Sequence, residues 1–212
     1  MVMPEAVEDE GMPAMPLEFV FDYSSPYAYF GSTLVEKVVQ RNGAELIWTP
    51  IVLGGIFQAR NHTAPIMGDK LKGKYLLEDL QNLSEFHGVP YKPRTDFIVK
   101  SILPLRATLA IPQGPERARA VHALFHGAWA QDLDLSDQAV TARLLDGAGF
   151  DGKKLCEATK QQAIKDELKR NTDEALARGI FGTPTFFVKG KMFWGHDRLD
   201  VVEQYLKRAK AS

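Results

Sequence analysis

A short strand that runs directly into a Ser-Pro helix start constrains the fold of this chain more than any other feature. Apolar side chains alternate along residues 17–21, which predicts a strand ending at Asp22. Ser25 and Pro26 follow at once, and proline suits the first helical position because it has no N–H to leave unpaired. The first N–H groups of a helix lack intrahelical partners and carry about half a positive charge. The sequence therefore predicts a turn that can hold an anion.

The segments around this turn predict an α/β core. Residues 26–40 have helical spacing and stop at Asn42-Gly43, and residues 45–49 form a second strand. A strand–helix–strand unit of this size favours parallel pairing with a right-handed crossover. Further along, we predict helices at about 71–87, 104–111, 115–131, 136–146 and 151–178, strands at 185–188 and 192–194, and a last helix at about 197–207.

Composition limits the classes of partner. The chain has 212 residues, 45% of them hydrophobic, and a formal net charge of −1, which is typical of an ordinary globular protein. Such a charge does not attract nucleic acid or an anionic membrane, so we expect neither as a partner. Residues 1–16 read as a frayed tail without an export signal, and the single cysteine, Cys156, fits a reducing cytoplasm. Cysteines of this kind are more often inert apolar filler than reactive thiols.

The turn itself resembles a known active site. Asp22, Ser25, Pro26 and Tyr27 follow the pattern Asp-x-x-Ser-Pro-[Tyr/Phe], which resembles the active-site turn of the DsbA-like branch of the thioredoxin superfamily. Disulfide-exchanging members carry Cys-Pro-x-Cys or a similar motif there, and a chain with one cysteine forms no dithiol within the monomer. The 2-hydroxychromene-2-carboxylate isomerases and the kappa-class glutathione transferases resemble this sequence better than those exchangers do.

The resemblance covers about residues 17–207 and implies a domain plan. It implies a thioredoxin-like fold with a helical insertion domain, as in DsbA. On that plan the thioredoxin-like domain comprises residues 17–60 and 179–212, and the insertion comprises residues 61–178. In both families the serine hydroxyl faces the sulfur of bound glutathione, so the resemblance implies glutathione as cofactor and Ser25 as the catalytic hydrogen-bond donor.

A second motif follows the predicted insertion. Residues 182–187, Gly-Thr-Pro-Thr-Phe-Phe, match the superfamily segment that faces the active-site turn. The resemblance implies that the Thr183–Pro184 peptide is cis and that the backbone of Thr183 is turned outward to pair with glutathione as an added strand. The residues alone would favour a trans proline at the start of a strand.

A third motif lies before the last predicted helix. Residues 195–198, Gly-His-Asp-Arg, resemble the Gly-x-Asp-Arg turn that contacts the γ-glutamyl end of glutathione in these families. That end is a zwitterion, so Asp197 would hold its ammonium, while helix N–H groups and Arg198 would hold its carboxylate. The alternative is that Asp197 only caps the helix and Arg198 only forms a surface ion pair.

A fourth segment is closest to the kappa transferases. Residues 53–61 and 72–79 resemble their Gly-Ile-x-Lys, Gly-Asn-x-x-Pro and Lys-Gly-x-Tyr-Leu blocks. On that match Asn61 is a polar contact near the sulfur, and Lys72 contacts an anionic part of glutathione. The spacing between the blocks is slightly longer here, so Lys70 or Lys74 is an alternative to Lys72. Taken alone, these lysines would form a solvated helix face.

Other residues suggest chemistry only weakly. His122 and His126 have a helical spacing that can bind a metal, yet no HExxH motif or carboxylate cluster accompanies them. We therefore predict structural histidines and no metal. Trp48, Trp129 and Trp194 are predicted to be core residues, with Trp194 close to the Gly195 turn.

These motifs favour one activity and leave two alternatives open. We expect a glutathione-dependent isomerase of the 2-hydroxychromene-2-carboxylate type, which adds the thiolate to a small aromatic substrate, lets the former double bond rotate, and releases the thiolate again. The first alternative is a kappa-like transferase that conjugates glutathione to small electrophiles. The second is a glutathione-binding or scaffold protein without catalysis. We further expect a cytoplasmic homodimer that acts in aromatic catabolism.

Overall fold

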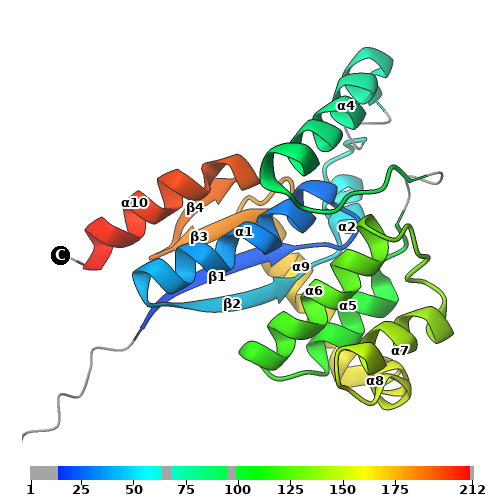
Figure 1. Ribbon diagram of the computed structural model, residues 1–212. Helices are drawn as coiled ribbons and strands as arrows, with labels where there is room; N and C mark the ends of the chain where they lie inside the picture. The colour runs from blue at the N-terminus through cyan, green and yellow to red at the C-terminus, as the bar shows by residue number, and fades with distance from the viewer. Residues whose placement is uncertain (1–13, 64–67, 95–98, 211–212) are drawn as a thin grey trace, which may run out of the picture.

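The computed structural model describes residues 14–63, 68–94 and 99–210, and it places helices on both faces of a four-stranded sheet (Figure 1). The described elements, in chain order, are β1 (Met15–Phe21), α1 (Pro26–Asn42), β2 (Ala44–Pro50), α2 (Leu53–Ala59), α4 (Lys70–His87), α5 (Ile102–Leu109), α6 (Pro115–Trp129), α7 (Gln138–Gly147), α8 (Gly152–Ala158), α9 (Gln162–Ala177), β3 (Thr185–Val188), β4 (Lys191–Trp194), the 3₁₀ turn η1 (His196–Arg198) and α10 (Leu199–Lys210).

The sheet has the strand order β2-β1-β3-β4. β1 and β2 are parallel, as the strand–helix–strand pattern predicted, while β3 is antiparallel to both β1 and β4. Phe19 lies at the centre, paired with Trp48 of β2 on one side and Phe186 of β3 on the other. The predicted thioredoxin-like fold of the DsbA type is thus confirmed by the arrangement of its sheet and helices.

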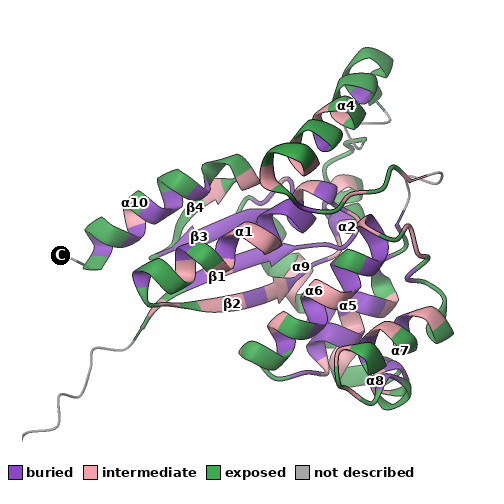
Figure 2. Ribbon diagram, viewed as in Figure 1, coloured by how far each residue is buried: buried purple, intermediate pink, exposed green. Residues whose placement is uncertain are grey.

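Alternation along the strands separates two apolar layers. Phe19, Phe21 and Phe186 belong to the main core cluster, together with residues of α1, α6 and α10. Val20 and Phe187 point to the opposite face, where they pack with residues of α2 and α9. The two central strands β1 and β3 are largely purple in Figure 2, because helices cover both faces of the sheet, whereas the outer strands β2 and β4 are mostly intermediate or exposed.

α4 differs from the other long helices in its exposure. It projects from the body of the molecule in Figure 1, and Gly73 and Leu80 are its buried residues. Large apolar side chains on it are open to solvent, with Leu71 and Phe86 each 83% exposed. The few contacts that hold α4 against the body of the molecule therefore determine where its side chains lie.

Three segments differ from the sequence-based prediction. β1 begins at Met15, so the last residues of the predicted tail 1–16 belong to the sheet, while residues 1–13 lie outside the described part. The helix predicted at 151–178 is two helices, because Thr159 ends α8 and its hydroxyl donates to the Cys156 carbonyl at 2.6 Å. α2 was not predicted as a helix.

The helices of the predicted insertion do not all lie apart from the sheet. α9 falls within residues 61–178, and its Ala175 packs with Val20 and Ile51 on the second face of the sheet. The boundaries of the two domains remain a prediction.

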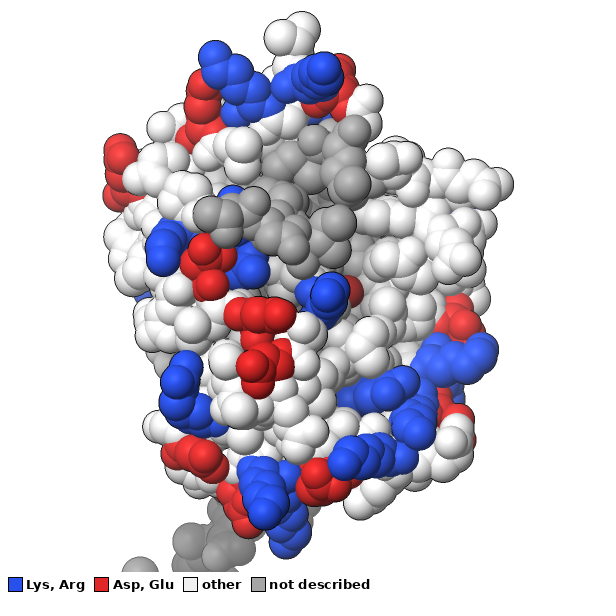
Figure 3. Space-filling view, turned by 90° about the vertical axis from the view of Figure 1, so that its right-hand side faces the viewer, with Lys and Arg blue, Asp and Glu red and all other residues white. Residues whose placement is uncertain are grey.

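The surface agrees with the near-zero net charge. Acidic and basic side chains are interspersed over the face shown in Figure 3, without a large area of one sign. Within residues 14–63, 68–94 and 99–210, no helix is both long and apolar enough to cross a membrane.

Candidate active site

Ser25 occupies the N-cap of α1, between the end of β1 and Pro26. Its backbone is extended, with φ −100° and ψ 113°, and its Oγ accepts a hydrogen bond from the Ala28 N–H at 3.2 Å. The same hydroxyl donates to the carbonyl of Thr183 at 2.9 Å. Ser25 is 5% exposed, and the first turn of α1 contains no acidic residue. The N-terminal positive end of α1 is therefore not countered by a charge from that turn.

The Thr183–Pro184 peptide is cis, as predicted. The structure brings Thr183 onto the Ser25 turn across 158 positions of sequence. One expectation changes, because the Thr183 carbonyl that we expected to be turned outward accepts the Ser25 hydroxyl. The Thr183 Oγ1 is buried and has no hydrogen-bond partner among the described residues.

Asp22 fixes the turn from behind. Its two carboxylate oxygens accept the N–H of Ser24 at 2.8 Å and the N–H of Leu53 at 2.7 Å. Burial raises the pKa of the Asp22 carboxyl, and hydrogen bonds from Ser101, Ser24 and Leu53 oppose that shift in part. Asp22 therefore ties the Ser25 turn to the start of α2, a role that the sequence motif contains but does not reveal.

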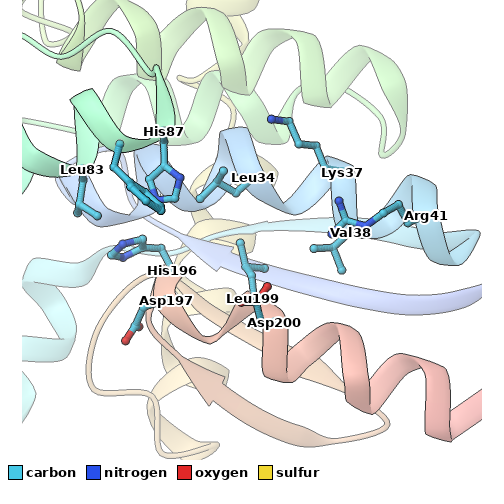
Figure 4. Close-up of a pocket in the computed structure, with 11 residues that line it drawn as sticks. Leu34, Lys37, Val38, Arg41, Leu83, His87, His196, Asp197, Leu199 and Asp200 are labelled. Carbon is cyan, nitrogen blue, oxygen red and sulfur yellow. The ribbon is translucent and has the colours of Figure 1, made fainter.

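A pocket of about 390 Å³ lies between α1, α4 and the start of α10 (Figure 4). Apolar side chains of Leu34, Leu83 and Leu199 line it together with charged and imidazole groups. His196 and Asp197 of the predicted γ-glutamyl turn are among its lining residues, whereas Ser25 is not. The pocket thus opens beside the predicted site and does not contain its serine.

Tyr27 connects this pocket to the Ser25 turn. Its ring stacks on the His196 imidazole, with centroids 5.3 Å apart, and its hydroxyl donates to Asp79 of α4 at 2.8 Å. His87 at the end of α4 meets the His196 ring edge-on at 6.4 Å. Burial lowers the pKa of His196, and the Asp197 carboxylate opposes that shift in part. Tyr27 and His196 thus hold α4 against the turn, and the motifs contain no signal for either contact.

Asp197 and Arg198 pair with each other. Arg198 Nη2 lies 3.4 Å from Asp197 Oδ2, and both side chains are more than half exposed. Asp197 is not a helix cap, because Gly195 is the N-cap of η1. A Cβ on Gly195 would collide with the Asp197 carboxylate, so glycine lets that side chain fold back over the turn. Both charges are therefore open to a zwitterionic ligand.

Asn61 and Lys72 lie at the two ends of the segment that joins α2 to α4. Asn61 is exposed just after α2 and has a left-handed backbone with φ 50°. Lys72 is exposed in the first turn of α4, which Asp69 caps by accepting the N–H groups of Leu71 and Lys72. Neither side chain is among the hydrogen-bond partners that Ser25 has within the described residues, so their roles near glutathione remain a prediction.

The geometry of α4 separates the three candidate lysines. Lys72 lies two helical turns before Asp79 and therefore on the same face, which is the face that Tyr27 contacts. Lys70 and Lys74 are about 200° around the helix from Lys72. Lys74 Nζ lies 3.7 Å from Glu78 Oε1. Lys72 thus shares the face of α4 that Tyr27 contacts, whereas Lys70 and Lys74 do not.

The remaining candidates divide between core and surface. Trp48 and Trp129 are buried as predicted, but Trp194 is 51% exposed, because β4 is an edge strand and its indole lies against Gly182 at the surface. His122 Nε2 lies 3.0 Å from Glu36 Oε1. No group of three or more metal-binding side chains occurs within the described ranges. Cys156 is buried, and burial raises the pKa of its thiol.

Comparison with known proteins places the chain in a family. The model of the DSBA-like thioredoxin domain matches residues 16–207, so the chain belongs to that family. The chain is 28% identical over 192 residues to a 2-hydroxychromene-2-carboxylate isomerase of Sphingobium xenophagum, covering 90% of this chain and 97% of that protein. It is 26% identical over 204 residues to glutathione S-transferase kappa 1 of Rattus norvegicus, covering 90% of each.

A solved structure agrees with the fold. The structure of a 2-hydroxychromene-2-carboxylate isomerase superposes with a TM-score of 0.84 at 24% identity and covers 92% of this chain and 96% of that one. The resemblance inferred from the sequence motifs is therefore confirmed at the level of the family.

Proposed function

We propose that this protein is a glutathione-dependent isomerase that acts on a 2-hydroxychromene-2-carboxylate or a closely related aromatic carboxylate. The main support is the Ser25 hydroxyl, held at the positive end of α1 with no acidic residue in the first turn. Relatives named as isomerases and as kappa transferases match nine-tenths of the chain, which supports chemistry that depends on glutathione.

The described residues fit glutathione. Ser25 would face its sulfur, the backbone of Thr183 would pair with its peptide, and the exposed Asp197–Arg198 pair would bind its zwitterionic end. Asn61 and Lys72 complete the proposed set. When bound, glutathione would supply a thiolate that adds reversibly to the conjugated system of the substrate and thereby permits rotation about the former double bond.

Ser25 acts as a hydrogen-bond donor to the sulfur in this proposal. Because its hydroxyl has a single proton, it can stabilise the thiolate only by leaving the Thr183 carbonyl. A thiol with a pKa of about 8.5 is only about 3% ionised at pH 7. A charge-assisted hydrogen bond contributes about 1.5–3 kcal/mol and the helix dipole about 0.3–1 kcal/mol. Turning the hydroxyl away from the Thr183 carbonyl costs about 0.5–1.5 kcal/mol.

The balance of these terms is about 2 kcal/mol, which lowers the thiol pKa by about 1.4 units. Nearly half of the bound thiol would then be ionised at pH 7. No base lies within hydrogen-bond reach of Ser25 among the described residues, since its side chain bonds to the Ala28 N–H and the Thr183 carbonyl. Ser25 is therefore proposed as a donor and not as a nucleophile.

A kappa-like transferase is the second candidate, because the segment around Asn61 and Lys72 resembles the transferases most.

One experiment separates the possibilities. An isomerase given a chromene carboxylate and substoichiometric glutathione will convert all of the substrate, seen as a spectral change, while free thiol stays constant. A transferase will instead consume free thiol with an activated aryl halide. If neither the spectral change nor the loss of thiol occurs, and calorimetry detects no glutathione binding, the remaining candidate is a scaffold protein. The expected cytoplasmic homodimer and the role in aromatic catabolism stay part of this proposal.

A further inference from the structure

Three arginines of the described residues lie over phenylalanine rings, and Arg60 is the one of them without an acidic partner there, since Arg119 pairs with Glu116 and Arg178 with Glu18. Arg178 Cζ lies 3.6 Å from the centroid of Phe187, and the guanidinium binds both carboxylate oxygens of Glu18, at 3.0 and 2.7 Å. Arg60 Cζ lies 5.7 Å from the centroid of Phe181. None of the described carboxylates forms an ion pair with Arg60. A guanidinium is a planar donor suited to a carboxylate. Glu18 occupies the guanidinium of Arg178 in this way, whereas the guanidinium of Arg60 can still bind a carboxylate from a ligand.

Phe181 belongs to an aromatic surface beside the Ser25 turn. Its ring meets the Trp194 indole edge-on, with centroids 4.8 Å apart, and Trp194 is 51% exposed. The indole lies against the chain at Gly182, where a Cβ would come within 2.7 Å of its Nε1. Gly182 directly precedes Thr183, whose carbonyl accepts the Ser25 hydroxyl. The aromatic pair thus adjoins the residues proposed to hold the reacting sulfur.

Arg60 is fixed to the same turn through α2. The Asp22 carboxylate accepts the N–H of Leu53 at the first residue of this helix, and Arg60 is its C-cap. A helix of this length spans about 10 Å. Arg60 is therefore held at the end of a short, tethered helix and lies over the Phe181 ring.

This arrangement matches a planar acid. An aromatic ring packs well on an exposed indole and a phenyl ring, and a carboxylate binds a guanidinium through two parallel hydrogen bonds. Glutathione also has a carboxylate at its glycyl end, but it has no aromatic group for the exposed indole. The two possible sources of the carboxylate can therefore be distinguished by experiment.

We propose that Arg60, Phe181 and Trp194 form the binding subsite for an aromatic carboxylate, in which Arg60 binds the carboxylate and the two rings pack against the aryl group. The proposal deepens the proposed function and rests on it for the identity of the substrate. It makes the Arg60 guanidinium, which the sequence analysis did not select, the group that recognises the carboxylate of the substrate.

The test measures binding without turnover. We would titrate the full chain with 2-naphthoate and follow tryptophan fluorescence, because Trp194 is exposed while Trp48 and Trp129 are buried. Arg60→Gln should weaken 2-naphthoate binding about tenfold, the size of one charge-assisted contact. Arg60→Lys should lose less, since it keeps the charge without the planar fork. The matched control Arg178→Gln, which changes another arginine over a phenylalanine, should bind like the original chain.

Two further measurements complete the test. The neutral analogue 2-naphthamide should bind equally to the original chain and to Arg60→Gln. Equal 2-naphthoate affinity in Arg60→Gln and in the original chain would overturn the proposal. A tenfold loss of glutathione affinity in calorimetry, with unchanged 2-naphthoate affinity, would also overturn it and assign Arg60 to the tripeptide. Absence of isomerase activity in the original chain would refute the proposed function alone, because 2-naphthoate binding is measured without glutathione.

Discussion

The two ends of α1 are built in opposite ways. At the C-terminal end, Gly43 adopts the left-handed cap conformation, Lys210 donates to the Asn42 carbonyl, and Arg41 binds Glu203 at 2.7 Å. Asn42 also donates to Glu203 at 3.2 Å. At the N-terminal end the helix has the buried Ser25 cap and no acidic side chain in its first turn. The protein thus satisfies the C-terminal pole of the helix with its own groups, whereas at the N-terminal pole it places no acidic residue in the first turn, and the nearby Asp22 carboxylate is bound to the N–H groups of Ser24 and Leu53.

This difference separates stability from binding within a single element. Cations near the last turn and anions near the first turn both stabilise a helix, by about 0.3–1 kcal/mol each at exposed sites. At the C-terminal end, Arg41 in the last turn supplies this stabilising interaction. The first turn at the Ser25 end has no acidic residue to supply it, so an anionic ligand can do so on binding. Variants at each end should therefore change different measurements.

The largest effect on activity is expected at the N-terminal end of α1, where Ser25 lies. Ser25→Ala removes the donor for the thiolate, so the pKa of bound glutathione should rise and kcat/KM should fall about 10- to 100-fold, as expected for one charge-assisted hydrogen bond. Ultraviolet absorbance of the thiolate, titrated with pH on the complex, would measure the pKa directly. Identical titration curves for both proteins would refute the role of Ser25.

Loss of a helix cap could imitate this result, so a second cap provides the control. Asp137 caps α7 by accepting the N–H groups of Ala139 and Val140, far in sequence from the site. Asp137→Ala should lower the free energy of unfolding by about 1 kcal/mol, as Ser25→Ala should, but leave kcat/KM unchanged. Parallel losses of activity in the two variants would mean that Ser25 acts only through stability.

The C-terminal end of α1 should govern how the free energy of unfolding changes at acid pH. Hydrogen bonds from Arg41 and then from Lys207 and Asn42 lower the pKa of Glu203 from 4.5 to about 2. A carboxyl with a lowered folded pKa stabilises the protein above its unfolded pKa, and this contribution is lost as the pH falls from about 4.5 to about 2. Because Arg41 and Lys207 are half exposed, we expect about 1–2 kcal/mol from Glu203 at pH 7 after solvent screening.

Glu203→Gln tests this value by urea unfolding at several pH values. Its deficit in the free energy of unfolding should be full at pH 7 and disappear toward pH 2, while kcat/KM at pH 7 stays unchanged. A deficit that does not depend on pH would assign the role of Glu203 to packing. Glu157→Gln, which removes an exposed partner of Lys160, is a suitable comparison and should change little.

The smallest effect is expected on α4. Lys72→Ala should weaken glutathione binding about two- to fivefold, as for one exposed charge, because Lys72 lies on the face that Tyr27 contacts. Lys74→Ala should have no effect, since Lys74 lies on another face near Glu78. Calorimetry at low and moderate salt would measure both. A larger loss with Lys74→Ala than with Lys72→Ala would show that the other face of α4 is turned toward glutathione.

Much of the fold was predictable because its signals are local. Alternation along 17–21 and the Ser-Pro start predicted β1 and α1, and the segment after Gly182 predicted the β3–β4 hairpin. α2 was missed, since it spans Leu53–Ala59 with two glycines in its first turn. Its first N–H is paired with Asp22, a contact across the fold that no local pattern shows.

The site shows the same division. Ser25, Thr183 and Asp197 could be selected from their motifs, because each motif is contiguous and has a distinctive order of residues. The position of Arg60 over Phe181 and the contact of the motif residue Tyr27 with Asp79 could not, since their partners lie elsewhere in the chain. The exposure of Trp194 also depends on β4 being an edge strand, which is a property of the whole sheet.

The sequence by itself determined most of the order of strands and helices and the Ser-Pro start of α1, because caps, proline positions and apolar alternation act over a few residues. The tertiary structure alone decided that the Ser25 hydroxyl is shared with the Thr183 carbonyl, that α4 is held by Tyr27, and that Arg60 lies over Phe181. These contacts join segments far apart in the chain, and their geometry is fixed only when the sheet and both of its covering layers have packed.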